Sequence, residues 1–224
     1  MFNDLKNQID FFIRNKTKFS RKNFIEKNPK NLERNKLENL YTKDILNQTI
    51  TKKPFKNAKI LDIGSKNWFY AKGEHEFFSS FCKNIELDGV ELDAHRLYSN
   101  LYSRYEVAKY HIKNLKNTTY YPKNLINIDK EYEYIIWFLP FITLNPHKYW
   151  GLPKKLFMPE VLLFHAYSIL KSQGEMLIIN QGEKEADIQK QLLDKFKINY
   201  KEIGIIKSEF LEYKNDRYAF LIQK

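Results

Sequence analysis

Two acidic residues follow apolar segments of this sequence at positions where a ligand-binding α/β protein needs them. Asp62 lies within Leu61-Asp-Ile-Gly64, and Glu91 lies within Gly89-Val-Glu-Leu-Asp93. In parallel α/β sheets, nucleotide-like ligands bind at the carboxyl ends of the strands. There glycine admits close backbone approach, and a carboxylate accepts hydrogen bonds from ribose hydroxyls. The two segments therefore predict a site for a nucleotide-like ligand.

The loop after Gly64 departs from the glycine-rich pattern of such sites. Lys66 and Trp68 stand where further glycines are usual, and their side chains take up space that a ligand would otherwise use. Two interpretations remain open. The loop follows another path and binds the ligand with Trp68 or Tyr70 packed on it, or Lys66 or Trp68 plugs the crevice. An open crevice beside Gly64 would favour an enzyme, and a plugged one a binding protein.

The candidate general base is His147, in the aromatic-rich segment 142–158. Imidazole exchanges protons near neutral pH, which suits proton removal from an oxygen acceptor. The alternative is a loop histidine that is hydrogen-bonded to the backbone. The other histidines are scattered and Cys82 is the single cysteine, so we expect a buried, structural Cys82, no disulfide and no metal site.

Strand and helix patterns alternate from Lys59 onward, which predicts a mostly parallel sheet with helices on both faces. The strand candidates are residues 59–63, 86–91, 118–121, 133–138, 174–180, 200–206 and 217–223. The helix candidates are residues 74–83, 94–109 (after a cap at Asp93), 159–171 and 184–196. The last two strands are joined directly, which indicates one antiparallel strand at the sheet edge.

Residues 1–55 are expected to form a basic helical cap before the sheet domain at 56–224. Phe2, Leu5, Ile9 and Phe12 recur at helical spacing, and Pro29 marks the start of another helix. Residues 1–56 hold fourteen Lys or Arg against six Asp or Glu, in a chain of net charge +11. This asymmetry suggests an anionic partner, with RNA as the candidate. The alternative is a general bias toward Lys, because 32 of the 38 basic residues are Lys.

The sequence has no apolar run of membrane-spanning length and no pattern of a secretory signal. We therefore expect a cytoplasmic protein with no membrane partner.

Residues 56–224 resemble the class I S-adenosylmethionine-dependent methyltransferases. Leu61–Gly64 resembles the first motif of that family, Gly89–Asp93 its second, and Leu170–Leu177 its turn into strand five. The resemblance implies a Rossmann-like, doubly wound, seven-stranded sheet, mostly parallel with one antiparallel edge strand, plus the N-terminal helical extension. It also implies S-adenosylmethionine as cofactor. The cofactor-binding positions that it implies are Asp62, Gly64, Ser65, Trp68, Glu91, Leu92, Asn124 and Phe138.

The activity implied by this resemblance is methyl transfer to an acceptor that the sequence does not identify. Phe138 takes the place of the Asn or Asp with which methyltransferases of exocyclic amines hold their acceptor, which argues against that acceptor class. The alternative is a non-catalytic protein of the same fold. It would bind RNA or a protein through the basic cap and an aromatic surface.

Overall fold

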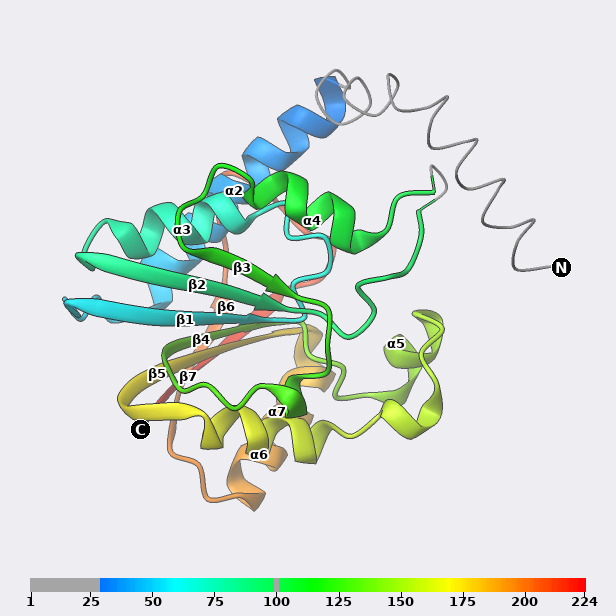
Figure 1. The fold of residues 1–224 in the computed structure, drawn as a ribbon. Coiled ribbons are helices and arrows are strands. Elements are labelled where there is room, and N and C mark those ends of the chain that lie inside the picture. Colours follow the sequence, from blue (N-terminus) through cyan, green and yellow to red (C-terminus); the bar gives the residue numbers. More distant parts are fainter. Residues whose placement is uncertain (1–28, 99–100) are drawn as a thin grey trace, which may run out of the picture.

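Seven strands form one sheet in the order β3-β2-β1-β4-β5-β7-β6 (Figure 1). The computed structural model describes residues 29–98 and 101–224. Its strands are β1 (Asn57–Ile63), β2 (Asn84–Val90), β3 (Thr118–Tyr121), β4 (Tyr132–Phe138), β5 (Leu170–Gln181), β6 (Tyr200–Ile206) and β7 (Arg217–Gln223). The sheet from β3 to β5 is parallel, and β7 pairs antiparallel with both β5 and β6. The predicted fold class is confirmed, with the antiparallel strand one place in from the edge.

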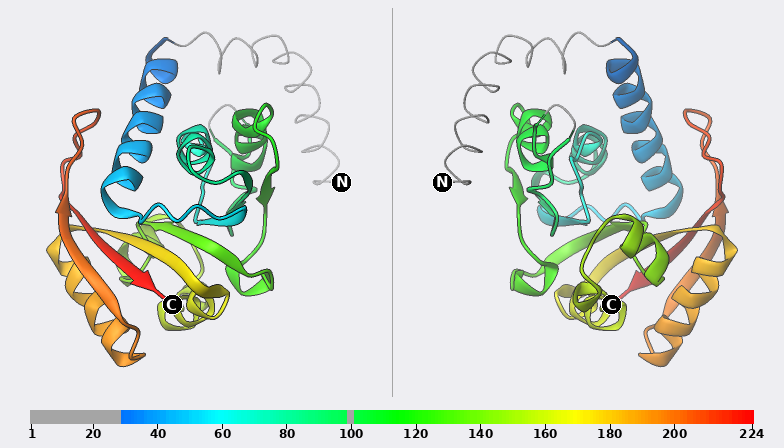
Figure 2. Two further views of the ribbon diagram at one scale, coloured as in Figure 1. Left: turned by 90° about the vertical axis from the view of Figure 1, so that its left-hand side faces the viewer. Right: turned by 90° about the vertical axis from the view of Figure 1, so that its right-hand side faces the viewer.

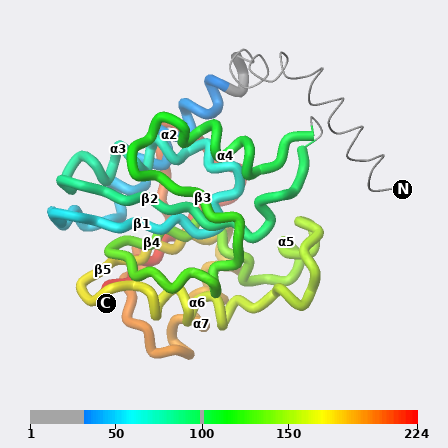
Figure 3. The backbone as a smooth tube through the Cα atoms, in the orientation of Figure 1, coloured from blue at the N-terminus to red at the C-terminus, as the bar shows by residue number. Residues whose placement is uncertain are grey.

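Helices cover both faces of this sheet (Figures 1 and 2). One face carries α2 (Pro29–Thr49), α3 (Ala71–Ser79) and α4 (Arg104–Ile112), and the other carries α6 (Pro159–Ser168) and α7 (Gly182–Lys195). The short helix α5 (Leu144–Tyr149) lies beyond the carboxyl ends of the strands (Figure 1). The tube in Figure 3 follows the chain out from β4 through α5 and back to α6. Two 3₁₀ turns, η1 (Leu125–Asn127) and η2 (Lys154–Leu156), complete the described elements.

The central strands are apolar on both faces, as a covered parallel sheet requires. Ile60 and Leu61 are adjacent in β1, and both are fully buried. Ile60 packs in the cluster under α2 and α3, whereas Leu61 packs in the cluster under α6 and α7. Burial of each such side chain contributes about 1.5–3 kcal/mol relative to exposure. The two clusters hold the carboxyl ends of the strands in a fixed row.

Helix α2 shares the core of the sheet. Its residues Tyr41, Ile45 and Leu46 are buried in the same cluster as β1 and α3. The division of the chain near residue 55 stays a prediction, and the apolar stripe from Phe2 to Phe12 lies outside the described residues.

The prediction of a helix over residues 94–109 is wrong in its first half. Asp93 does not cap a helix, because its carboxylate is held by Arg96 and Arg104 instead. The helix begins at residue 104, after Ser103, whose side chain accepts from the N–H of Glu106 in a capping box. A capping box satisfies two backbone donors at once, so it fixes the helix start at this point. The carboxyl ends of the strands, in contrast, lie within one residue of their predicted positions, whereas β1 and β2 begin two residues and β5 four residues earlier than predicted.

Cys82 is buried, as predicted. Within residues 29–98 and 101–224, no helix is long and apolar enough to cross a membrane. No group of three or more His, Cys, Asp or Glu in that part of the chain is arranged to hold a metal ion.

Candidate functional site

A cavity of about 540 Å³ opens at the carboxyl ends of the parallel strands. Of the nine predicted catalytic and cofactor-binding residues, six line it: Gly64, Glu91, Leu92, Asn124, Phe138 and His147. The other three, Asp62, Ser65 and Trp68, are buried behind its wall. The nine predicted residues thus lie together at the carboxyl ends of the strands, six on the surface of the cavity and three buried behind it.

Gly64 forms the floor of the cavity, directly after β1. Its φ of +77° lies in the left-handed region that glycine tolerates best. A Cβ added there would meet no atom within 4 Å. The crevice beside Gly64 is therefore open.

Lys66 and Trp68 adopt the backbone conformation that glycines would favour. Their φ angles are 54° and 46°, both left-handed. For an L-residue this conformation costs about 1–2 kcal/mol. The loop thus passes through glycine-like backbone conformations at both positions without the glycines.

Trp68 points away from the cavity into the core. It is fully buried, and its indole N–H donates to Glu74 Oε2 at 2.8 Å. It packs on Gly89 in β2, where an added Cβ would come within 2.9 Å of the indole and 2.7 Å of Ser65 Oγ. A glycine in the strand therefore makes room for the tryptophan of the loop.

Lys66 lies on the cavity wall. Its backbone N–H donates to Glu91 Oε2 at 2.9 Å, and its Nζ lies 5.2 Å from the centre of the Trp150 ring. Burial, together with the nearby Arg104, lowers the pKa of the Lys66 ammonium. The backbone of Lys66 thus positions Glu91, while its side chain borders the ligand space.

We expect Lys66→Gly to be more stable than Lys66→Ala by about 1 kcal/mol, because only alanine retains the left-handed strain. Both variants lose the same ammonium group, so the comparison isolates the backbone. At Lys36, an exposed position inside α2, the order should reverse, since glycine in a helix costs about 1 kcal/mol relative to alanine. Urea unfolding of the four variants measures both differences. Equal stabilities for the two Lys66 variants would contradict the strained path of the loop.

Glu91 presents a fixed carboxylate to the cavity. Oε2 accepts from the N–H of Lys66, and Oε1 accepts from the N–H of Asp93 at 2.7 Å. The side chain of Arg104 approaches Oε1 to 3.9 Å. Each carboxylate oxygen offers two acceptor sites, so Glu91 keeps acceptor capacity for a ligand after these backbone bonds are made.

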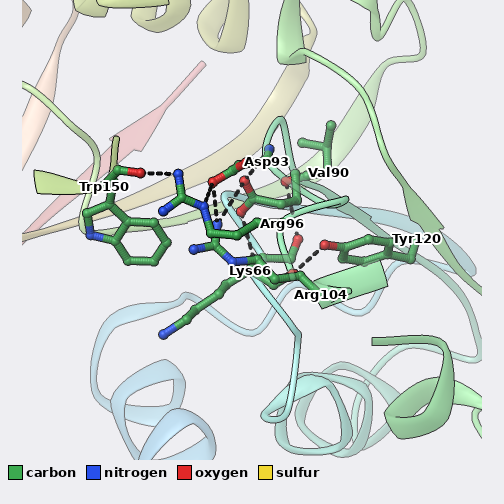
Figure 4. A network of polar contacts seen from close by, with 9 residues as sticks. Lys66, Val90, Asp93, Arg96, Arg104, Tyr120 and Trp150 are labelled. Atoms are coloured by element: carbon green, nitrogen blue, oxygen red, sulfur yellow. Dashed lines mark hydrogen bonds and ion pairs between the residues drawn. The ribbon is translucent and has the colours of Figure 1, made fainter. Parts of the chain in front are cut away.

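A network of charged residues fastens the α5 segment beside Glu91 (Figure 4). Asp93 lies between Arg96 and Arg104, with contacts of 2.5 and 3.1 Å. Arg96 donates to the carbonyl of Trp150, and the Arg104 guanidinium stacks 4.3 Å from the centre of the Trp150 ring. The indole thereby closes one side of the cavity.

Asp62 is separated from the cavity by Tyr70. The Tyr70 hydroxyl donates to Asp62 Oδ2 at 2.9 Å, while Asp62 Oδ1 is buried without a hydrogen-bond partner. Burial raises the pKa of Asp62 to about 8, against the lowering effect of bonds from Tyr70 and Ser65. Tyr70 itself lines the cavity.

The raised pKa of Asp62 makes stability depend on pH. Between about pH 4 and the folded pKa, the folded protein binds a proton that the unfolded chain has lost, so stability falls as pH rises through this range. Asp62→Asn removes that proton while keeping an acceptor for Tyr70. We expect the stability of the wild type relative to Asp62→Asn to fall steadily from pH 5 to pH 8. Urea unfolding at each pH measures it, and parallel curves for the two proteins would refute the assignment.

His147 is packed into the cavity wall. It lies in α5 rather than in a loop, is 2 % exposed, and its Nε2 lies 3.0 Å from the carbonyl oxygen of Pro153. A carbonyl only accepts, so Nε2 carries the proton and Nδ1 is the nitrogen left to take one up. The rings of Phe141 and Phe157 contact the imidazole on either side. Its role as a general base stays a prediction.

Asn124 and Phe138 both line the cavity. Asn124 caps η1, with its side-chain oxygen accepting from the N–H of Ile126 at 3.3 Å. Phe138 ends β4 and packs 6.0 Å from the ring of Tyr70.

Several cavity residues gave no recognisable pattern in the sequence. Trp150 is held at the cavity by Arg104, which does not itself line the cavity and lies 46 residues earlier in the chain. A further group lines the part of the cavity under α2 and beyond β5: Glu38, Tyr41, Thr42, Glu185, Tyr213 and Arg217. No spacing rule links these residues, because they meet only when α2 packs beside the β6–β7 connection (Figure 2).

No protein-family model and no curated protein matches the sequence. Solved structures match the fold with probability 1.00. A methyltransferase from Pyrococcus furiosus is 16% identical with a TM-score of 0.57, and the match covers 83% of this chain and 82% of that one. A S-adenosylmethionine-dependent methyltransferase from Aquifex aeolicus is 13% identical with a TM-score of 0.55, over 83% and 89% of the two chains.

The chain has the class I methyltransferase fold. A third structure with this methyltransferase fold, Pyrococcus horikoshii TYW2 in complex with MeSAdo, is 8% identical with a TM-score of 0.51. That match covers 83% of this chain and 61% of the TYW2 chain. Identities this low extend the likeness to the fold and no further.

Proposed function

We propose that the protein is a S-adenosylmethionine-dependent methyltransferase. The observation that supports this most is the open cavity beside Gly64, with the Glu91 carboxylate on its wall. Ligands of open α/β sheets bind at this edge.

The residues present fit this cofactor. Gly64 leaves free space where a side chain would block close approach. Glu91 offers acceptor sites suited to a ribose diol. The cavity also falls in the volume range of small-molecule sites, about 300–1,000 Å³.

The chemistry expected of these residues is binding, orientation and exclusion of water. S-adenosylmethionine supplies an electrophilic methyl group when it is bound. Glu91 would hold the ribose hydroxyls, and the floor at Gly64 would admit the methionine portion. The rings of Phe138 and Trp150 would keep water from the reacting atoms, and a fixed geometry alone lowers the barrier substantially.

A crevice plugged by Trp68 or Lys66 would favour the non-catalytic alternative. Trp68 is instead buried in the core, and Lys66 lies along the wall beside Trp150. The basic residues 1–28 lie outside the described chain, so RNA binding stays a prediction from the charge distribution alone.

Calorimetric titration and thermal unfolding with S-adenosylhomocysteine test the proposal. At a ligand concentration of 100 times the dissociation constant, binding stabilises the folded state by about 2.7 kcal/mol. Adenosine serves as the control, because it carries the ribose without the amino-acid portion. A protein that binds neither S-adenosylhomocysteine nor S-adenosylmethionine at millimolar concentration is not a methyltransferase of this kind.

A further inference from the structure

The cavity extends past the expected cofactor region to the end of β5 and the start of β7. Gln181, at the end of β5, pairs with Arg217, at the start of β7. Both residues line the cavity, together with Tyr41 of α2 and Tyr213 of the β6–β7 connection. We call the part of the cavity lined by these four residues the β7 arm.

The β7 arm is too far from Glu91 and Gly64 to belong to the cofactor region. Neighbouring strands lie about 4.8 Å apart, so β7 is about 14 Å from β1 and about 19 Å from β2 across the sheet. A cofactor with its ribose at Glu91 and its methionine portion over Gly64 spans β2, β1 and β4. The β7 arm is left for a second ligand.

Arg217 places a buried positive charge in this arm. It is 8 % exposed, and its NH1 group donates to the carbonyl of Asn215 at 3.2 Å. Within the described chain no carboxylate forms an ion pair with it, whereas Arg34, Arg96 and Arg104 each have one. Burial of a charge is costly unless an opposite charge compensates it.

Two acids that line the same part of the cavity as Arg217, Glu38 and Glu185, are already engaged. Glu38 accepts from Arg34 at 2.8 Å and from the hydroxyl of Tyr213. Glu185 accepts the N–H of Gln181 at 3.1 Å and interacts with Arg217 only at longer range. The guanidinium therefore retains donors for a ligand.

Aromatic rings flank the guanidinium. Arg217 lies 4.4 Å from the centre of the Tyr213 ring, which meets the Tyr41 ring edge to face at 5.1 Å. Tyr70 and Phe138 also line the cavity. Aromatic walls favour a planar ring in the ligand, and the fork of a guanidinium matches the paired oxygens of a carboxylate or phosphate.

We propose that the β7 arm binds the methyl acceptor, and that this acceptor is a small aromatic molecule with an anionic oxygen group held by Arg217. The role of this ligand as methyl acceptor rests on the proposed methyltransferase function, whereas the anion site itself rests only on Arg217 and its surroundings. Carboxylate and phosphate share the chemistry that Arg217 recognises.

Titration calorimetry with benzoate and with phenyl phosphate tests this, each with and without S-adenosylhomocysteine, and with benzyl alcohol as the neutral control. At least one anionic probe should bind saturably, and benzyl alcohol at least tenfold more weakly. The better of the two anionic probes distinguishes a carboxylate from a phosphate source. If neither binds the wild type up to 10 mM (roughly −2.7 kcal/mol), the proposal is overturned.

Variants then locate the site. Arg217→Gln should weaken the anionic probe at least tenfold, and Arg217→Lys, which keeps the charge without the fork, should weaken it less. Arg34→Gln is the matched control, because Arg34 lies in the same cluster but is paired with Glu38. Equal probe affinity in the wild type and in Arg217→Gln would overturn the proposal. If Arg217→Gln does not fold, the probe affinities of Arg217→Lys and Arg34→Gln are compared instead. An Arg217→Lys protein that binds the anionic probe as tightly as Arg34→Gln would overturn the proposal.

The two proposals fail separately. Binding of an anionic probe without any binding of S-adenosylhomocysteine would leave the anion site and remove the methyltransferase function. If S-adenosylhomocysteine binds and neither anionic probe does, the methyltransferase function stands and the anion site is overturned.

Discussion

Glu91→Ala is expected to lower the affinity for S-adenosylhomocysteine at least about 100-fold. Hydrogen bonds to a charged group contribute about 1.5–3 kcal/mol each, and a ribose diol makes two of them with Glu91 in the proposed complex. The substitution also frees the backbone N–H of Lys66 and of Asp93, so the loop loses its anchor. Titration calorimetry at neutral pH measures the change.

Glu86→Ala is the matched control for Glu91→Ala. Glu86 lies in β2, the strand that Glu91 directly follows; it is paired with Lys130 and does not line the cavity. Its removal should leave the affinity for S-adenosylhomocysteine within about twofold, because surface ion pairs contribute about 0–1 kcal/mol. A Glu91→Ala protein that folds and binds like Glu86→Ala would show that the ribose does not lie on Glu91.

Trp68→Ala is expected to lower the free energy of unfolding by about 3–5 kcal/mol, as for other large aromatic residues removed from a core. The indole is fully buried between Gly89 and α3 and satisfies one oxygen of Glu74. Removal of the indole also leaves Glu74 Oε2 buried without its donor, which adds to the loss of stability. Urea unfolding measures the loss.

Trp150→Ala provides the comparison for Trp68→Ala. Trp150 is half-buried at the cavity, where it contacts Lys66 and Arg104. Its removal should cost less stability than removal of Trp68, and should instead widen the cavity. The opposite order would mean that Trp68 is the residue at the ligand and Trp150 the core residue.

Most of the fold could be predicted from local hydrophobic patterns in the sequence. Strands buried on both faces appear as short apolar runs, as in Ile60–Ile63 and Tyr134–Phe138, so their ends could be placed closely. Gly64 and Glu91 directly follow such runs, so the sequence places both at the carboxyl ends of the strands, where the cavity lies. In these segments local propensity and tertiary burial agree.

The loop conformation could not be predicted, because its explanation lies in another strand. Nothing within residues 65–70 shows that Trp68 turns into the core. The space for it comes from Gly89, 21 residues later. An isolated glycine inside a strand does indicate close approach by another group, but it does not say which group. The helix start at residue 104 escaped prediction for a similar reason, since Asp93 binds arginines instead of capping.

The β7 arm also depends on long-range packing. Tyr213 and Glu38 are 175 residues apart in the chain and share a hydrogen bond. The sequence predicts that a strand begins at residue 217, and β7 begins there. Sequence spacing does not show that Arg217 lines a cavity or that no carboxylate pairs with it. Only the pairing of β5 with β7 brings it to the cavity.

A crystal structure of the protein with S-adenosylhomocysteine tests the central claim most directly. The account predicts the ribose hydroxyls within hydrogen-bond distance of Glu91, the amino-acid portion over Gly64, and Trp68 still buried against Gly89. A ligand bound elsewhere, or a Gly64 crevice filled by Lys66 or Trp68 in the presence of saturating S-adenosylhomocysteine, would contradict it.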